Sequence, residues 1–190
     1  ASLAGGGVSF RPGECSLANC GVLFLDELPE FSRESLEVLR QPLEDGQITV
    51  SRTAGSATYP SRFQLIAAMN PCKCGYFGHP TRPCTCSPSA VRQYRSRVSG
   101  PLLDRIDLCV EMDPVAFDQL HSAAPAESSA ALRQQVQAAR EIQAKRYAAP
   151  GFENIHCNAQ LTAGQVRRSL LDEEALLEAL QYRAQEKVEI

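Results

Sequence analysis

A short apolar run that ends in two adjacent carboxylates restricts the fold of this chain more than any other feature. The run, Gly21-Val-Leu-Phe-Leu-Asp26-Glu27, is too short to span a membrane, and its composition favours a strand buried on both faces. Ligands of open α/β sheets bind at the carboxyl ends of such strands. In P-loop ATPases an Asp at this position holds Mg²⁺, and the next Glu activates the attacking water. Asp26 and Glu27 therefore predict a nucleotide site; the alternative is a core strand followed by an acidic turn.

Composition and charge narrow the class of protein. The 190 residues, 44% of them hydrophobic, can bury one medium core with a small appendage, and the net charge of -3 argues against a uniformly basic nucleic-acid binder. A basic segment nevertheless runs from Lys73 to Arg105 between acidic flanks. No apolar run approaches the roughly 18 residues of a membrane helix, and no leader pattern is recognisable, so we expect a cytoplasmic protein without a membrane partner. The start at Ala1, without a methionine, suggests a fragment of a longer protein.

After a loop-rich lead-in over residues 1–20 and the first strand, the pattern predicts a helix, a hairpin and a second strand. Ser32 is a candidate N-cap for leucines at helical spacing. Residues 48–59 alternate as in a β-hairpin, with the turn expected at Gly55-Ser56. The next apolar run forms the second buried strand and ends at Asn70, which places another polar group at a strand's carboxyl end.

The second half of the chain is predicted to be irregular at first and then mainly helical. Residues 71–88 are too rich in Cys, Gly and Pro for regular structure. We expect Ser89 to cap a basic helix that runs to about Arg97, and residues 107–111 to form a third short strand. Further helices are predicted at residues 128–147, from about Thr162 and from about Asp172.

The order of these motifs resembles that of the AAA+ ATPases. Within them the chain is similar, over about residues 2–170, to the magnesium-chelatase-like group, the YifB/ComM family. Three strings carry the resemblance: Gly21-Val-Leu-Phe-Leu-Asp-Glu-Leu-Pro-Glu, Ala68-Met-Asn-Pro-Cys and Ser99-Gly-Pro-Leu-Leu-Asp-Arg-Ile-Asp. The resemblance implies an α/β fold: a partial P-loop ATPase core, namely the second half of its parallel sheet with a Cys-rich loop, followed by a small all-α lid. We assign residues 1–114 to the core, 115–125 to a linker and 126–190 to the partial lid.

The resemblance also implies roles for four residues. Asp26 and Glu27 would be the Walker B pair, and Asn70 would be the sensor that holds the attacking water, so that these three residues bind ATP with Mg²⁺. Arg105 would be the arginine finger that enters a neighbouring subunit's site, which implies a homo-oligomeric ring, expected to be a hexamer. An arginine supplied in this way is worth roughly 10³ to 10⁵ in rate. The alternative for Arg105 is a surface ion pair with Asp104 or Asp107, worth about 0 to 1 kcal/mol.

The phosphate-binding loop of the family has no counterpart in this sequence. A Walker A motif needs Gly-x₄-Gly-Lys-Ser/Thr, whereas Lys73, Lys145 and Lys187 are followed by Cys, Arg and Val. The resemblance places that loop upstream of Ala1, so we expect this chain alone not to hydrolyse ATP. Loss of the Walker A strand would also leave the strands near residues 63 and 107 with unpaired parallel edges.

Two Cys-x-Cys pairs form the candidate metal site. Four thiolates could close this Gly- and Pro-rich loop around a structural Zn²⁺, with His79 as a possible replacement for one ligand. The alternative is a loop that carries four reduced cysteines. A catalytic metal is not expected, because no general-base His or Glu accompanies the cluster. The four candidate ligands are Cys72, Cys74, Cys84 and Cys86.

Four arginines are candidates for contact with DNA. Arg52 is expected at the tip of the hairpin, where related ring ATPases carry an insertion that touches DNA, and its alternative role is to protect a sheet edge. The others can form a broad basic face on one helix, or simply a solvated face. They are Arg92, Arg95 and Arg97.

Three functions remain open on this reasoning. The first is a fragment of a ComM-like AAA+ motor that couples ATP hydrolysis to DNA translocation and branch migration in recombination and natural transformation. The second is a magnesium-chelatase-type motor subunit that drives metal insertion into a porphyrin. The third is a zinc-stabilised, non-enzymatic module that binds DNA or protein.

Overall fold

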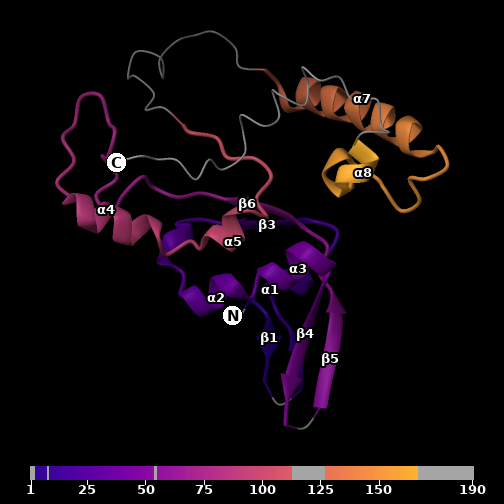
Figure 1. Ribbon diagram of the computed structural model, residues 1–190, viewed down its shortest axis with the longest axis horizontal. Coiled ribbons are helices and arrows are strands. Elements are labelled where there is room, and N and C mark those ends of the chain that lie inside the picture. Colours follow the sequence, from indigo (N-terminus) through magenta and orange to yellow (C-terminus); the bar gives the residue numbers. More distant parts are fainter. Residues whose placement is uncertain (1–2, 8, 54, 113–126, 167–190) are drawn as a thin grey trace. The chain divides into compact units, whose positions relative to one another are not determined.

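The structure is a computed structural model that describes residues 3–7, 9–53, 55–112 and 127–166 (Figure 1). These residues fall into two compact units, which divide between Cys109 and Val110. The linker predicted at 115–125 and the helix expected from Asp172 lie outside the described residues. In the parts of the chain that are described, no helix has both the length and the apolar character needed to cross a bilayer.

Two parallel strands, β3 (Val22–Leu25) and β6 (Gln64–Ala67), form the centre of the first unit. Leu23 and Leu25 are 8% and 5% exposed, whereas Val22 and Phe24 are 54% and 59% exposed. The expectation that the first strand is buried on both faces is therefore wrong for the described residues. The second strand, expected to be buried as well, carries only half-buried and exposed residues. Side chains alternate between the two faces of a sheet, and the buried cluster gathers on one face only.

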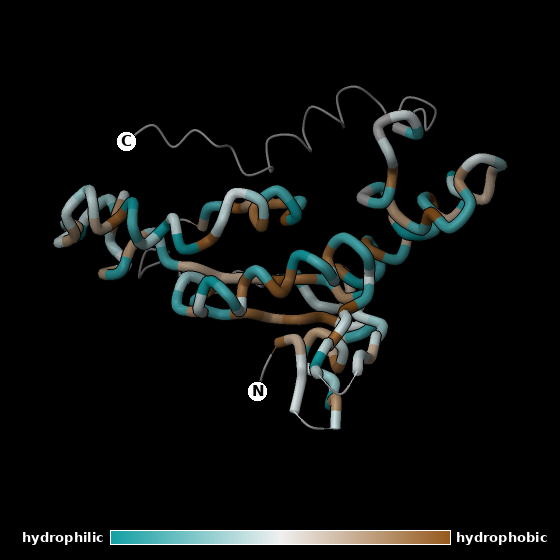
Figure 2. Tube along the Cα trace, turned by 60° about the horizontal axis from the view of Figure 1, so that its bottom comes forward, coloured by the Kyte–Doolittle hydropathy of each residue, from teal (hydrophilic) through white to brown (hydrophobic). Residues whose placement is uncertain are grey.

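The buried cluster joins the strands to the helices of the same unit. It contains Leu23 and Leu25 of β3, Leu36 and Leu39 from the helical segment that follows, and Leu102. Figure 2 shows hydrophobic residues along the extended segments in the middle of the picture, with mainly hydrophilic stretches on the helices and loops around them. Burial of these leucines on one face of the sheet holds its strand ends in place.

The helical segment after β3 is broken into three short pieces. They are the 3₁₀ turn η1 (Leu28–Glu30) and the helices α2 (Arg33–Glu37) and α3 (Arg40–Asp45). Ser32 caps α2 as predicted, because its hydroxyl accepts the Ser35 N–H at 3.2 Å. Pro42 has no N–H to donate to the carbonyl four residues earlier, which explains the break between α2 and α3. Gly46 ends α3 with a φ of 66°.

The predicted hairpin is confirmed as β4 (Gln47–Arg52) and β5 (Gly55–Pro60). The strands are antiparallel, and Arg52 pairs with Gly55. The turn therefore precedes Gly55 instead of occupying Gly55-Ser56, because both of these residues belong to the returning strand. Figure 1 shows the hairpin projecting away from the β3–β6 pair.

The lead-in that the sequence predicts to be loop-rich contains regular structure. It holds a two-residue antiparallel pair and one helical turn, β1 (Gly5–Gly6), β2 (Arg11–Pro12) and α1 (Glu14–Leu17). The backbone of Gly5 lies so close to Arg11 that a Cβ there would collide with the Arg11 carbonyl. The glycines that suggested a loop are instead needed for this close approach.

The segment after β6 is irregular, as predicted, and we call residues 71–86 the cysteine loop. It leads into α4 (Pro88–Arg95) and α5 (Gly100–Leu103). Ser89 does not cap α4. Ser87 does, accepting the Ala90 N–H at 3.3 Å, because Pro88 fits the first helical position, where no N–H is needed.

The third strand, predicted at 107–111, is absent from the structure: these residues are described, but they form no ladder. Leu108 and Val110 are 61% and 64% exposed. A strand requires a neighbour to which its backbone can hydrogen-bond, and within the described ranges no strand pairs with this segment.

The described part of the second unit is helical. It contains α7 (Ser129–Tyr147), the 3₁₀ turn η2 (Asn158–Gln160) and α8 (Ala163–Val166). Ser128 caps α7, so the helices predicted at 128–147 and from about Thr162 are confirmed. Tyr147 is buried against Phe152, with ring centroids 5.4 Å apart, and its hydroxyl donates to Asn158 Oδ1 at 2.6 Å.

Candidate functional site

The carboxyl ends of β3 and β6 form the candidate nucleotide site. The strands are parallel, and Leu25 pairs with Ala67, so Asp26 and Asn70 follow at the same edge. Two backbone hydrogen bonds extend the pairing beyond the strands: Ala68 N–H donates to the Leu25 carbonyl at 2.9 Å, and Leu28 N–H donates to the Ala68 carbonyl at 3.0 Å. The structure thus brings the predicted Asp26, Glu27 and Asn70 to one edge, and all three are exposed there.

The turn that carries the acids has an unusual backbone. We call residues 26–30 the carboxylate turn. Glu27 adopts a left-handed conformation, with φ 51° and ψ 46°, and its N–H donates to Asp26 Oδ1 at 2.8 Å. For a residue other than glycine this conformation costs about 1 to 2 kcal/mol. Such strain is concentrated at functional sites, and here it directs the chain into the buried Leu28 and Pro29 while both carboxylates face solvent.

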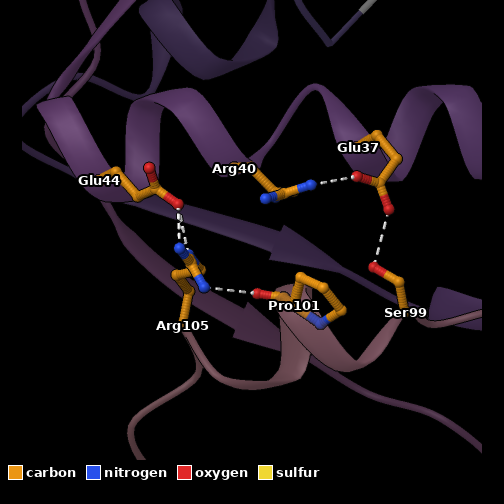
Figure 3. A network of polar contacts seen from close by, with 6 residues as sticks. All are labelled: Glu37, Arg40, Glu44, Ser99, Pro101 and Arg105. Carbon is orange, nitrogen blue, oxygen red and sulfur yellow. Dashed lines mark hydrogen bonds and ion pairs between the residues drawn. The ribbon is translucent and has the colours of Figure 1, made fainter.

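Arg105 follows α5 and is held within its own chain (Figure 3). Its guanidinium pairs with Glu44 of α3 through Nε and Nη2, and its Nη1 donates to the Pro101 carbonyl at 3.1 Å. The alternative predicted an ion pair with Asp104 or Asp107, but the partner is Glu44, because the tertiary fold places α3 beside the end of α5. The role of arginine finger concerns a neighbouring subunit and stays a prediction.

A second polar contact joins the end of α2 to Ser99, the residue before α5, and was not anticipated. Ser99 Oγ donates to Glu37 Oε1 at 2.7 Å, and Arg40 Nη1 donates to Glu37 Oε2 at 3.0 Å (Figure 3). The hydrogen bond from Ser99 and then that from Arg40 hold the pKa of Glu37 below its ordinary 4.5. In the sequence, Ser99 was visible only as part of a family motif, since no local pattern links it to a residue 62 positions earlier.

The four predicted metal ligands come together in the cysteine loop. Sγ atoms lie 3.3 Å apart for Cys72 and Cys74, 3.7 Å for Cys72 and Cys84, and 3.5 Å for Cys74 and Cys84. Cys86 completes the cluster, and all four sulfur atoms lie within 4.8 Å of one another. We call these residues the four-cysteine cluster. Tetrahedral sulfur sites of this kind take Zn²⁺ or iron, so the donor set fits a metal ion.

His79 is not part of the cluster. Its Nδ1 accepts backbone hydrogen bonds from Thr81 at 3.2 Å and from Arg82 at 3.1 Å, and it belongs to the loop tip beside Tyr76. The possibility that His79 replaces one ligand is therefore not supported by its position. Among the described residues, the candidate metal site therefore consists of the four cysteine sulfur atoms.

The pKa values of the thiols in the cluster are shifted in opposite directions. Backbone N–H groups of Tyr76 and Thr85 donate to the Cys74 sulfur and lower the pKa of that thiol to about 5. A backbone hydrogen bond at Cys86 favours the Cys84 thiolate, but burial and the neighbouring sulfur atoms outweigh it and raise the pKa of Cys84 to about 12. Neighbouring thiolates repel one another, so a cation among them would favour ionisation of the cluster.

The arginines predicted to contact DNA do not form one exposed face. Arg52 ends β4 and is exposed, as expected for a hairpin tip, and Arg92 is exposed on α4. Arg95 instead donates to the Pro71 carbonyl at 3.1 Å and stacks on Phe77, while Arg97 donates to the Pro29 carbonyl at 3.0 Å. Contact with DNA stays a prediction for all four, and two of them have a structural task within this chain.

Comparisons with known proteins identify the family to which the chain is similar. Residues 1–120 match the protein family described as magnesium chelatase, subunit ChlI. The uncharacterized protein YifB of Escherichia coli is 51% identical over 147 residues, which cover 76% of this chain and 28% of YifB. The competence protein ComM of Haemophilus influenzae is 45% identical over 161 residues, 84% of this chain and 30% of ComM. A chloroplastic magnesium-chelatase subunit ChlI of Oryza sativa subsp. indica is 36% identical over 70 residues, 37% of this chain and 17% of that subunit.

The matches cover most of this chain but only part of each bacterial relative. The chain spans about three-tenths of the length of the two bacterial relatives. The family match covers more than half of the chain and includes the strand ends and the four-cysteine cluster. The chain therefore belongs to the magnesium-chelatase-like YifB/ComM family.

Proposed function

We propose that this chain is part of the ATPase core of a ComM-like AAA+ motor that couples ATP hydrolysis to movement along branched DNA in recombination and natural transformation. The observation that carries the proposal is the shared strand edge with Asp26, Glu27 and Asn70, tied by hydrogen bonds from Ala68 and Leu28. The competence relative, at 45% identity over 84% of the chain, favours DNA as the client. The proposed partners are further copies of the same protein, in a hexameric ring, and DNA.

Each residue at the edge has a defined task in this proposal. ATP and Mg²⁺ supply the reactive phosphate and neutralise its charge when bound. Asp26 would hold the metal through its exposed carboxylate, Glu27 would orient and deprotonate the attacking water, and Asn70 would hold that water. The left-handed turn at Glu27 supports this division, because it directs two adjacent carboxylates into solvent at one strand end.

The test is ATP hydrolysis by the full-length protein that contains this chain, with and without branched DNA. Stimulation by DNA supports the motor. Hydrolysis that is indifferent to DNA points to a chelatase-type motor, the second candidate, which the ChlI family match favours. Absence of hydrolysis points to a binding module. Glu27→Gln should abolish turnover, whereas Glu34→Gln, an exposed acid on α2, should leave it unchanged.

Arg105 provides an independent test of the ring. If the Arg105 guanidinium leaves Glu44 to reach a neighbouring subunit's phosphate, Arg105→Ala should lower turnover by roughly 10³-fold or more while ATP binding stays normal. Its fold should persist, because surface ion pairs contribute only about 0 to 1 kcal/mol. Arg33→Ala, an exposed arginine on α2, is the control. Equal turnover in the Arg105 variant and wild type would reject the finger role.

A further inference from the structure

The cysteine loop begins directly after Asn70, at Pro71-Cys72, and its order does not come from a packed core. Among residues 71–86 only Cys72 is buried, and no helix or strand is present. The loop nevertheless returns on itself, so that Cys84 and Cys86 meet Cys72 and Cys74. An irregular segment with so little buried apolar surface needs another source of order to offset its conformational entropy.

The sulfur separations among Cys72, Cys74 and Cys84 are close to those of one tetrahedral metal site, and Cys86 lies within 4.8 Å of these atoms. With Zn–S distances of roughly 2.3 Å, the four sulfur atoms of a zinc site lie roughly 3.8 Å apart. The observed Sγ separations of 3.3, 3.5 and 3.7 Å are close to this value. Gly75 makes the first pair possible, because its φ of 82° closes a tight turn in which its N–H donates to the Cys72 carbonyl at 3.0 Å. Four protein ligands leave no open position, which is typical of a structural site.

Groups around the cluster orient the ligands. Backbone N–H groups of Tyr76 and Thr85 donate to the Cys74 sulfur. At the loop tip, Arg82 Nη1 donates to the Tyr76 hydroxyl at 3.0 Å, and the guanidinium lies 5.4 Å from the centre of the Tyr76 ring. Hydrogen bonds to the ligands and their neighbours are characteristic of built metal sites.

Helix α4 connects this loop with the strand ends. On one side, Arg95 Nε donates to the carbonyl of Pro71, the residue between Asn70 and Cys72, and the Arg95 guanidinium lies 5.0 Å from the centre of the Phe77 ring. These contacts fix the first residue of the cysteine loop. Asn70 is therefore followed directly by Pro71, whose carbonyl is held by Arg95, and then by Cys72, a candidate metal ligand.

On the other side, Arg97, which lies two residues beyond the end of α4, holds the carboxylate turn. Arg97 Nη1 donates to the Pro29 carbonyl at 3.0 Å and pairs with Glu30 Oε2 at 3.2 Å. Tyr94, the residue before Arg95, is buried, at 6% exposure. Its burial, and then the charges of Glu30 and Glu27, raise the pKa of its hydroxyl, which agrees with its place beside the carboxylate turn.

We propose that the four-cysteine cluster binds one Zn²⁺, and that the zinc-bound cysteine loop acts through Arg95 and Arg97 to position Asn70 and the carboxylate turn. In this proposal zinc is a structural cofactor of the strand ends that carry Asp26, Glu27 and Asn70. Arg95 and Arg97 are positioning residues. The metal site itself is independent of the proposed ATPase function, and only the effect on turnover rests on that function.

Metal content tests the site first. The purified full-length protein should contain about one zinc ion per chain by mass spectrometry of its metals. The double variant Cys84→Ser/Cys86→Ser should lose that zinc, whereas Cys20→Ser, which removes an exposed cysteine elsewhere, should retain it. Iron in place of zinc, no metal, or zinc retained by the double variant would overturn the assignment.

Hydrogen exchange then tests the positioning role without any need for ATP hydrolysis. Removal of zinc by a chelator should make the amides of Leu28 and Ala68, which close the two strand ends, exchange several-fold faster. Arg95→Gln should accelerate the same amides while zinc content stays at wild-type level. Gln93→Ala, an exposed change on the same helix, is the matched control. Unchanged exchange at both amides after zinc removal would refute the positioning role while leaving the metal site intact.

Turnover provides the final readout in the full-length protein. Without DNA, Arg95→Gln should lower kcat roughly 10-fold with little change in KM for ATP, because it displaces Asn70 but removes no nucleotide contact. Arg95→Lys should restore part of the loss by keeping the cation over Phe77. A rise in KM alone would contradict the positioning role. If wild type does not hydrolyse ATP, the proposed function fails, and metal content and exchange still decide this inference.

Discussion

The packed core and the cysteine loop of the first unit are stabilised by different physical means. Leu36, Leu39 and Leu102 are at most 1% exposed, and they hold helices and strands together by apolar burial. The cysteine loop buries only Cys72 and has no regular structure, but it gathers four sulfur atoms within 4.8 Å of one another. The leucine core is ordered by burial of apolar side chains. The cysteine loop has four side chains that could bind a metal ion, and such a metal would order the loop.

The core and the segments beyond the strands contribute differently to holding the carboxyl ends of β3 and β6 in place. The core holds β3 and β6 from the face that carries Leu23 and Leu25. Beyond the strands, the carboxylate turn is anchored in the core by Leu28, whereas the cysteine loop is mostly exposed. Arg95 of α4 and Arg97, just beyond the helix, add polar contacts to the carbonyls of Pro71 and Pro29. The two regions should therefore respond differently to chelators, truncation and pH.

Chelation should show the largest difference. Removal of zinc from the four-cysteine cluster should lower the free energy of unfolding by several kcal/mol, given that structural zinc contributes roughly 10 to 16 kcal/mol in isolated finger peptides. The loss should be smaller here than in those peptides because the leucine core persists without metal. Thermal melting with and without chelator measures it. An unchanged melting temperature would show that no bound metal stabilises the cysteine loop.

Truncation in the core should be large and independent of chelator. Leu39→Ala removes a side chain with no exposure and should lower the free energy of unfolding by about 2 to 5 kcal/mol. The matched change Leu17→Ala, at a side chain 67% exposed, should cost less than about 0.5 kcal/mol. Denaturant unfolding of both variants, each with and without chelator, separates the two regions. Equal costs at Leu39 and Leu17 would contradict the assigned core.

A backbone change in the cysteine loop should have a moderate effect. Gly75 has a φ of 82°, and the space around a new Cβ is open, so Gly75→Ala should cost about 1 kcal/mol through backbone strain alone. Gly164→Ala, at a helical glycine that has ordinary φ and equally open space, should be neutral or slightly stabilising. Zinc affinity and unfolding of the two variants are the measurements. A neutral result at Gly75 would mean that the loop turns differently from the structure.

Acid should weaken the polar contact beside the core, with the smallest effect. Glu37 has a pKa below 4.5 in the folded protein, so the unfolded chain binds its proton more readily. The stabilisation is present above pH 4.5 and is lost as the pH falls through the folded pKa. Glu37→Gln should flatten the fall in stability over that acid range, whereas Glu34→Gln should not. Parallel acid profiles for wild type and Glu37→Gln would exclude the contribution.

Much of the candidate site could be predicted from local sequence. Asp26 and Glu27 lie at a strand end because an apolar run precedes them, and Asn70 follows the next strand for the same reason. Two Cys-x-Cys pairs on a loop rich in Gly and Pro were enough to predict the four-cysteine cluster. Errors occurred where a nearby competitor was equally suitable, as with Ser87 and Ser89 around Pro88.

The remaining features depend on contacts between distant residues. The segment at 107–111 has the composition of a strand, but a strand depends on a partner, and none pairs with it in the described residues. Burial on one face of β3 likewise depends on which elements cover the sheet. A local pattern contains no information about either.

The sequence by itself determined which chemical groups this protein presents: two carboxylates and an amide at strand ends, and four thiols on one loop. These depend on residue type and on spacing over a few positions, which local physics sets. Tertiary structure decided their partners. Arg105 lies against Glu44, and Arg95 and Arg97 hold Pro71 and Pro29, because packing of the core brings α3, α4 and α5 to places that no single segment specifies. Long-range contacts arise only when apolar surfaces far apart in the chain are buried together.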